Sequence, residues 1–293
     1  MTSVKWFKEL ENNSYGPLIK IDREIISVDT GIQKLTVFEN VDLGRVLLLD
    51  DVIMLTEKDE FTYHEMLVHP ALLAHPNPAD VLVIGGGDGG CVREIVKHKE
   101  VRHAVLCEID PAVIEYSKKF LPFTACGFES PRVTVHIGDG MQYVTDNPGG
   151  FDVVIVDSTD PIGIAEGLFQ SPFYRGCQNA LKPGGIFVQQ AESPFFDFNK
   201  WFGIFNEVNK AFSKVFAYGA AVPMYLSGYW TFVFASNSRD PWTDFSKDRA
   251  DALTGLRYYS EKLQQSSFQL PAFAELALKK SLSGHEGQKT AMS

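Results

Sequence analysis

A glycine-rich loop between an apolar strand and a helix is the feature that most constrains the fold of this chain. Residues 85–90 read GGGDGG and lie between the predicted strand Asp80–Ile84 and the predicted helix Cys91–His98. Glycines allow a tight turn and let a ligand approach the backbone, and the helix N-terminus presents free N–H groups. The next predicted strand ends in Glu108, about 20 positions after the glycines, where an acid is placed to bind ribose hydroxyls. This arrangement predicts an adenosine-containing ligand, either a dinucleotide or adenosylmethionine.

Strands and helices alternate along the chain after residue 80. Strands such as FDVVIVD at residues 151–157 are nearly continuous apolar runs, which is typical of a parallel sheet with helices on both faces. Further strands are predicted at His103–Glu108, Val133–His136, Asp152–Asp157, Gly185–Gln190, Val215–Ala221 and Trp230–Ser236, and further helices at Pro111–Phe120, Gly140–Thr145, Pro172–Leu181 and Asn199–Phe212. The pattern predicts an α/β fold with a doubly wound, mostly parallel, Rossmann-like (methyltransferase-type) sheet.

The first 60 residues show no helical pattern and predict a separate, antiparallel β unit. Short strands are separated by turn signals and are predicted at Ile19–Ile21, Ile25–Thr30, Gln33–Glu39 and Arg45–Asp50. A helix follows at Glu60–Leu73 and stops before the sequence HPNP at residues 75–78. We therefore expect a small β-hairpin domain over residues 1–60, a Rossmann-like catalytic domain over residues 61–280 and a flexible tail over residues 281–293.

Composition excludes several classes of partner. The chain has 37 Asp and Glu residues against 27 Lys and Arg, a formal net charge of −10, which argues against nucleic acid or an anionic membrane because either requires a basic surface. No apolar run approaches the roughly 18 residues of a membrane span. The four cysteines have no CxxC spacing, which favours reduced thiols in a cytoplasmic protein. The scattered histidines have no partner acids at ligand spacing, so no metal site is predicted.

Two acidic residues narrow the choice of ligand. Asp139, in the Asp139-Gly140 pair, follows the third strand of the alternation, where adenosylmethionine-type sites read the adenine amino group; this favours a sulfonium ligand over NAD. Asp88 lies inside the glycine loop, where its charge would repel a pyrophosphate or the carboxylate of intact adenosylmethionine. It suits a ligand with a bare ammonium, as in decarboxylated adenosylmethionine. The alternative is that Asp88 caps the helix that begins near Gly90, and the two roles are compatible.

A second pair of acids follows the strand at residues 152–157. Asp157 and Asp160 lie in the sequence DSTDPIG, beyond the carboxyl end of a strand, where ligands bind in open α/β sheets. Two carboxylates there can hold an alkylammonium and accept its proton, which leaves a neutral amine as nucleophile. The alternative is a loop with solvated acids. Glu192 is either a ligand for the far amine of such a molecule or a loop carboxylate bonded to backbone.

Several short segments together resemble the spermidine synthase (polyamine aminopropyltransferase) family. They are GIQKL, FTYHEM, GGGDGG, CEID, GDG, DSTDPIG with AEGLF after it, and QQAESPF, in family order within residues 5–236. The resemblance implies an enzyme that moves the aminopropyl group of decarboxylated S-adenosylmethionine to a diamine, usually putrescine. The products would be spermidine and 5′-methylthioadenosine, and no metal would be required. The resemblance, and the need to cover strand edges, also imply a homodimer or homotetramer formed through the N-terminal β unit.

The resemblance assigns roles to residues at matching positions. It places the methylthioadenosine part of the donor against Gln33, Glu108, Asp139 and Gly140, and the aminopropyl amine near Asp88 and His64. It places the acceptor against Tyr63, Asp160 and Tyr225, with Glu192 as a further candidate, and makes Asp157 the proton acceptor. One position departs from the family. Ile164 stands where a proline is common on the adenine side, so the apolar wall is kept but the backbone is freed.

Three alternatives stay open. The first is a putrescine N-methyltransferase that uses intact adenosylmethionine, against which Asp88 argues. The second keeps the aminopropyl transfer but takes agmatine, cadaverine or a longer amine as acceptor. The third is a non-catalytic sensor of a polyamine or nucleoside, against which the presence of both Asp157 and Asp160 argues.

Overall fold

A seven-stranded, mostly parallel sheet forms the body of the molecule in the computed structural model, which describes residues 4–11, 14–161 and 163–280. Its strands are β7 (Asp80–Gly85), β8 (His103–Glu108), β9 (Val133–Ile137), β10 (Phe151–Asp157), β11 (Leu181–Gln190), β12 (Lys214–Ala221) and β13 (Tyr229–Ser236). They run in the order β12-β13-β11-β10-β7-β8-β9; β13 pairs antiparallel with both β12 and β11, and the other pairs are parallel. This topology confirms the predicted doubly wound α/β fold.

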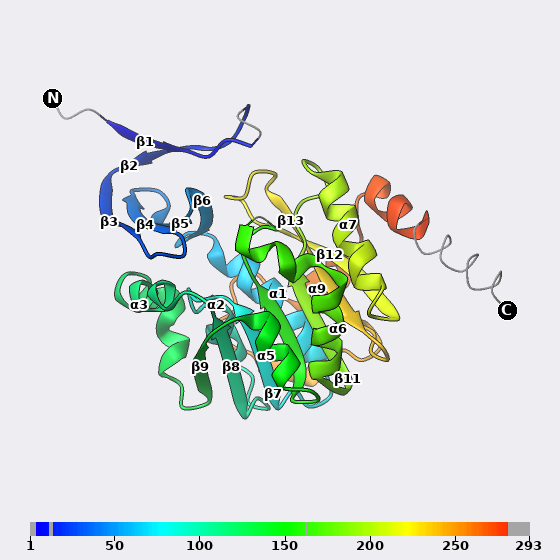
Figure 1. Cartoon of the computed structure of the whole chain (residues 1–293). Coiled ribbons are helices and arrows are strands. Elements are labelled where there is room, and N and C mark those ends of the chain that lie inside the picture. The colour runs from blue at the N-terminus through cyan, green and yellow to red at the C-terminus, as the bar shows by residue number, and fades with distance from the viewer. Residues whose placement is uncertain (1–3, 12–13, 162, 281–293) are drawn as a thin grey trace.

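Helices cover both faces of this sheet (Figure 1). One face carries α1 (Glu60–Ala74) and α2 (Gly90–Ile95), and the other carries α5 (Gly140–Asp146), α6 (Ser171–Ala180) and α7 (Phe198–Asn209). Alternate side chains of β7 face the two layers, and all four from Val81 to Ile84 are buried. Each such side chain contributes about 1.5–3 kcal/mol when it is fully buried. The continuous apolar strands are therefore explained by burial on both faces.

The remaining elements are short. They are α3 (Pro111–Phe120), α4 (Pro122–Ala125), η1 (Cys126–Glu129), η2 (Gly163–Phe169), α8 (Lys247–Ala252) and α9 (Glu261–Ser267). Apart from α3, none of these was predicted, because segments of four to seven residues are too short to display a helical period. None of the described helices is long and apolar enough to cross a membrane.

The N-terminal residues form two small antiparallel sheets, drawn in blue beside the large sheet (Figure 1). They contain β1 (Lys5–Lys8), β2 (Leu18–Ile21), β3 (Arg23–Asp29), β4 (Lys34–Asn40), β5 (Gly44–Leu49) and β6 (Val52–Thr56). The prediction missed β1 and β6 and placed β5 one residue too late in the sequence, at Arg45–Asp50. Asp50 and Asp51 both have positive φ and form the tight turn that joins β5 to β6. No glycine marks this turn, so it could not be recognised from the residues alone.

The four-stranded N-terminal sheet, β3 to β6, packs on α3 of the large domain through an apolar cluster. Leu35, Leu47 and Leu55 of the small sheet contact Val113 of α3 and Leu121 after it. This contact holds the β3–β4 hairpin near the carboxyl ends of the parallel strands. The division into domains at residue 60 stays a prediction, and the predicted tail over residues 281–293 lies outside the described residues.

The chain changes direction between β7 and β10, which lie side by side at the centre of the sheet. From β7 the chain continues to β8 and β9 on one side, and from β10 to β11 on the other. Gly85 at the end of β7 pairs with Asp157 at the end of β10. Ligands bind beyond the carboxyl ends of strands at such a switch point. The glycine loop and the acidic loop therefore meet here.

Candidate active site

A cavity of about 210 Å³, here called the inner cavity, lies at this switch point. Its wall includes ten of the predicted site residues: Gln33, Tyr63, His64, Asp88, Glu108, Asp139, Gly140, Asp157, Ile164 and Tyr225. The other two, Asp160 and Glu192, line an adjoining cavity of about 150 Å³, here called the outer cavity. Tyr63 and Tyr225 line both. The structure thus brings every predicted site residue to one of two adjoining cavities.

The glycine loop lets the backbone come close to the centre of the inner cavity. Gly86 has a φ of +69°, and a Cβ atom there would lie 2.8 Å from Oδ2 of Asp157. A side chain at this position would therefore collide with the carboxylate and strain the backbone. The predicted reason for the glycines, a tight turn with room beside it, agrees with this geometry.

Polar groups from three elements line the nucleotide end of the inner cavity. The buried Glu108 carboxylate accepts hydrogen bonds from the backbone N–H groups of Gly87 (3.1 Å) and Asp110 (2.9 Å), and burial raises its pKa to about 7. Asp139 caps α5 by accepting from the N–H of Met141. Gln33 reaches across from the N-terminal hairpin and donates to Asp110 at 3.0 Å. Carboxylate and amide groups in this arrangement can bind ribose hydroxyls and an exocyclic amine.

Asp157 lines the inner cavity beside Tyr63, which lines both cavities. Its Oδ1 accepts a 2.8 Å hydrogen bond from the hydroxyl of buried Tyr63, and its Oδ2 is buried without a hydrogen-bond partner among the described residues. Burial raises the pKa of Asp157, as does the charge of Asp88, while His64, the nearby Cys91 thiol and the Tyr63 hydroxyl lower it. A buried acceptor with one free oxygen can take a proton from a bound group.

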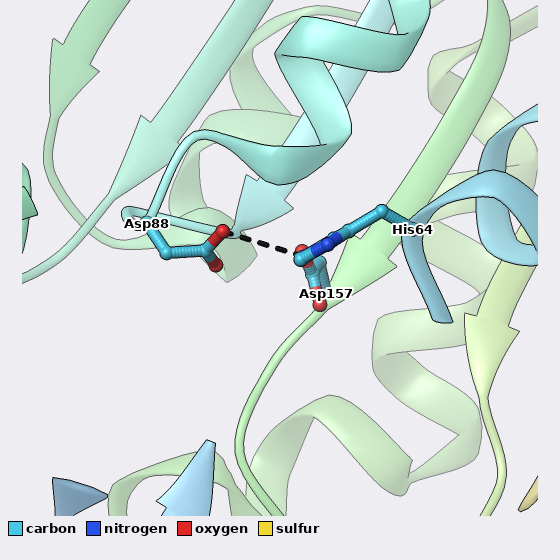
Figure 2. A group of neighbouring side chains, drawn as sticks. All are labelled: His64, Asp88 and Asp157. Carbon is cyan, nitrogen blue, oxygen red and sulfur yellow. Dashed lines mark ion pairs between the residues drawn. The ribbon is translucent and has the colours of Figure 1, made fainter. Parts of the chain in front are cut away.

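His64 and Asp88 lie beside Asp157 (Figure 2). His64 Nε2 is 3.3 Å from Asp88 Oδ1, and its Nδ1 is 2.7 Å from Oε2 of Glu60. Asp88 Oδ1 also accepts from the N–H of Gly90 at 2.8 Å, so the capping alternative is correct in that Asp88 does bond the first residue of α2. The same carboxylate faces the cavity, which leaves the predicted contact with an ammonium open.

His64, Asp88 and Asp157 form a cluster that was not predicted from the sequence. One ligand atom each from His64, Asp88 and Asp157 lie within 4.8 Å of one another, a spacing that a metal ion could also use. The signal was hidden because the three residues come from three separate segments. The predicted absence of a metal therefore stays a prediction.

The outer cavity is acidic and partly apolar. Asp160 lines it together with Glu192, whose Oε1 is buried and has no hydrogen-bond partner among the described residues. Burial, and then the charge of Asp160, raise the pKa of Glu192 to about 8, against the opposing charge of Lys200. The Tyr225 hydroxyl donates to the carbonyl of Met54 at 2.8 Å, which fixes the aromatic wall. An alkylammonium would find unsatisfied carboxyl oxygens here.

Some predicted details differ in the structure, and some residues were missed. Ile164 lies on the rim of the inner cavity with 62% of its surface exposed, so it forms an open edge of the wall. Asp110, Glu60 and Arg93 were not predicted, although they hold Gln33 and His64 in place. The spacing of Glu60 and His64, four positions apart on one helix, was the one available signal.

The fold and the two cavities define a class of protein, a Rossmann-like enzyme with two ligands. The inner cavity suits a nucleotide-type ligand and contains a buried carboxylate, and the adjoining acidic cavity suits a second ligand. Two family models match this chain. The spermine/spermidine synthase domain matches residues 60–247, and the spermidine synthase tetramerisation domain matches residues 5–57. The chain belongs to the spermine/spermidine synthase family. The predicted family and the assignment to the aminopropyltransferases are confirmed.

Individual relatives are similar over almost their whole length. A polyamine aminopropyltransferase of Thermotoga petrophila is 44% identical over 276 residues, which cover 93% of each chain. One of Bacillus cytotoxicus is 43% identical over 92% of this chain and 97% of its own. A spermidine synthase solved in complex with the transition state analogue AdoDATO superposes with a TM-score of 0.92 at 42% identity, over 94% of this chain and 95% of its own.

Proposed function

We propose that the protein transfers the aminopropyl group of decarboxylated S-adenosylmethionine to putrescine, and so forms spermidine and 5′-methylthioadenosine. The observation that carries the proposal is the buried Oδ2 of Asp157, which has no hydrogen-bond partner among the described residues and belongs to a carboxylate bonded to Tyr63, a residue that lines both cavities. A solved relative of 42% identity holds a transition state analogue, AdoDATO, which supports the same chemistry in this chain.

The donor occupies the inner cavity in this proposal. Glu108 binds the ribose hydroxyls, Asp139 and Gly140 border the adenine, and Gln33 and Ile164 close the sides. Asp88 pairs with the ammonium at the end of the aminopropyl chain. Two carboxylates, Asp88 and Asp157, surround that part of the cavity, which disfavours a donor that carries its own carboxylate.

The acceptor amine enters from the outer cavity, between Tyr63 and Tyr225. Its far ammonium binds Asp160 and Glu192, and its near amine reaches Asp157. A free alkylamine has a pKa of about 10.4 and is protonated at neutral pH. Asp157 takes up that proton on Oδ2, and the neutral nitrogen then attacks the carbon next to the sulfonium.

The reaction requires the protein to position the attacking amine and to accept one proton from it. A new C–N bond forms as the C–S bond breaks, the sulfonium leaves as a neutral thioether, and one proton is released per turnover. Holding the amine in line with the C–S bond contributes roughly 7–11 kcal/mol to catalysis. No step in this scheme requires a metal ion.

Assembly and location complete the proposal. The N-terminal sheets form the contact in a homodimer or homotetramer, which the match to a tetramerisation domain over residues 5–57 supports. Trp6 and Leu18 of the first sheet are exposed apolar side chains suited to such a contact. Four free cysteines, three of them buried, suit a reducing cytoplasm.

The test is a direct assay of which donor and acceptor the protein uses. The reactions run in buffer with a metal chelator, and mass spectrometry identifies the products. Purified protein is incubated with decarboxylated or intact adenosylmethionine, each with putrescine, cadaverine, agmatine or spermidine. Methylthioadenosine and spermidine from the decarboxylated donor with putrescine are the expected products. Methylated amine from the intact donor would reverse the interpretation of Asp88, and no product from either donor would contradict the proposal. A preference for another amine would retain the reaction and change the acceptor.

A further inference from the structure

Four ionisable side chains in contact with one another, Asp88, His64, Glu60 and Arg93, lead from the inner cavity into the protein. His64 Nε2 lies 3.3 Å from Asp88, and His64 Nδ1 lies 2.7 Å from Glu60. Glu60 in turn is held by both terminal nitrogens of Arg93, at 2.7 and 2.9 Å. Glu60 and His64 are almost completely buried. The mechanism above uses only Asp88, so the role of the other three residues is open.

The imidazole of His64 is fixed in a narrow slot. A Cβ atom at Gly90 would lie 2.3 to 2.4 Å from three atoms of the ring, so the ring lies directly against the backbone of α2. The ring of Tyr63 contacts it edge-on on another side. Because the ring cannot turn, each nitrogen keeps its carboxylate partner.

An imidazole with a carboxylate at each nitrogen bonds both of them only when both nitrogens carry a proton. The groups that face His64 are Glu60 from its own helix, Asp88 from the glycine loop and Asp157 from β10, with Arg93 of α2 behind Glu60. The negative groups outnumber the single positive one. Burial lowers the pKa of His64, but the charges of Asp88 and Glu60 and their hydrogen bonds to the ring hold it well above its usual value.

We propose that Glu60, held in place by Arg93, is a positioning residue that keeps His64 protonated so that Nε2–H donates to Asp88. Asp88 Oδ1 then accepts from both His64 and the N–H of Gly90. Its Oδ2 accepts no hydrogen bond from the described residues and is left for the ammonium of the donor. A neutral His64 that donates from Nδ1 to residue 60 would turn a lone pair toward Asp88, and one that keeps its proton on Nε2 would donate to Asp88 without the added strength of a positive charge.

The inference rests on the proposed function, because it assigns Glu60 to donor recognition. Glu60→Gln keeps the size of the side chain but removes its charge, so the pKa of His64 should fall. Donor affinity should then fall as the pH rises. The loss should be about tenfold, the size expected for one hydrogen bond to a charged group.

Calorimetry with the full-length protein tests this inference. Wild type and Glu60→Gln are titrated with decarboxylated adenosylmethionine and with methylthioadenosine, which lacks the aminopropyl amine, at three pH values from 6.5 to 8.5. The dissociation constant of the donor should stay level in wild type and rise about tenfold in Glu60→Gln. That of methylthioadenosine should be the same in both. Equal donor affinities at every pH in the two proteins would overturn the inference.

Two further variants guard the interpretation. Glu57→Gln is the control. Glu57 is an exposed glutamate that lines the same surface pocket as Glu60, and its variant should bind the donor as wild type does. A pH-dependent loss of donor affinity in Glu57→Gln would contradict the specific role of Glu60. If Glu60→Gln fails to bind methylthioadenosine, Arg93→Lys serves instead, because the loss of the paired hydrogen bonds frees the Glu60 carboxylate to move away from Nδ1 of His64. It should weaken donor binding in the same pH-dependent way, and an unchanged profile would overturn the inference. If the wild type transfers the aminopropyl group but donor affinity in the variants does not depend on pH, this inference alone is refuted. If the wild type binds the donor but forms no product, the proposed function alone is refuted.

Discussion

The hydroxyl of Tyr63 lies 2.8 Å from Oδ1 of Asp157 and donates a hydrogen bond to it. One carboxylate oxygen is therefore satisfied by the protein, and the other is buried and without a partner among the described residues. The hydrogen bond favours the ionised form of Asp157, in opposition to burial, and so lowers a pKa that burial raises. Tyr63 thus keeps Asp157 available as a base in a dry site.

Removing that hydroxyl should change the pH dependence of turnover. In Tyr63→Phe the pKa of Asp157 should rise, so the acidic limb of the kcat profile should move to higher pH, with a loss of kcat of roughly tenfold at neutral pH. Steady-state rates across the pH range measure both. Tyr225→Phe is the matched comparison, because its hydroxyl bonds the carbonyl of Met54 rather than Asp157. An unmoved limb in Tyr63→Phe, or an equal movement in both variants, would contradict this role.

Asp88→Asn tests the pairing of Asp88 with the donor's ammonium. Loss of the charge should raise the dissociation constant of decarboxylated adenosylmethionine by about tenfold or more. The affinity for methylthioadenosine should change little, since that molecule has no amine at this position. Calorimetric titration with both ligands makes the comparison. Equal losses for the two ligands would show that Asp88 supports the loop and not the ammonium.

Acceptor binding should depend on pH through Glu192. Burial and the charge of Asp160 raise its pKa to about 8, so at pH 6.5 this carboxyl is protonated and must release a proton to bind an ammonium. The acceptor should therefore bind more tightly as the pH rises through 8, by roughly tenfold between pH 6.5 and 8.5. Titration with putrescine in the presence of methylthioadenosine measures this. Glu192→Gln should bind weakly at all pH values, and a pH dependence that survives in this variant must come from another group.

Much of the fold could be predicted because burial on both faces leaves a plain trace in the sequence. Strands β7 and β10 are almost wholly apolar, and glycines or acids follow each of them. The turn at Asp50 and Asp51 could not be predicted, since both residues have positive φ without the usual Asn-Gly or Asp-Gly signal.

In the site, too, residues that belong to a local motif could be predicted, and contacts between residues far apart in the sequence could not. Asp88 and Asp157 could be found because each follows a strand that predicts a ligand-binding edge. The support of His64 by Arg93 could not, because Arg93 lies 33 positions from Glu60 and meets it only after α1 and α2 pack together. Gln33 and Asp110 meet across 77 positions for the same reason. Contacts between elements are set by packing, and a single sequence does not record them.

Oδ2 of Asp157 takes the proton of the attacking amine in this mechanism, and Asp157→Asn removes that base. The variant keeps the shape of the side chain and loses the base, so kcat for aminopropyl transfer should fall by at least about 100-fold. The dissociation constant of methylthioadenosine, measured on the same sample, should stay within about twofold of wild type, a change of under 1 kcal/mol. Turnover close to the wild-type rate in this variant would contradict the account.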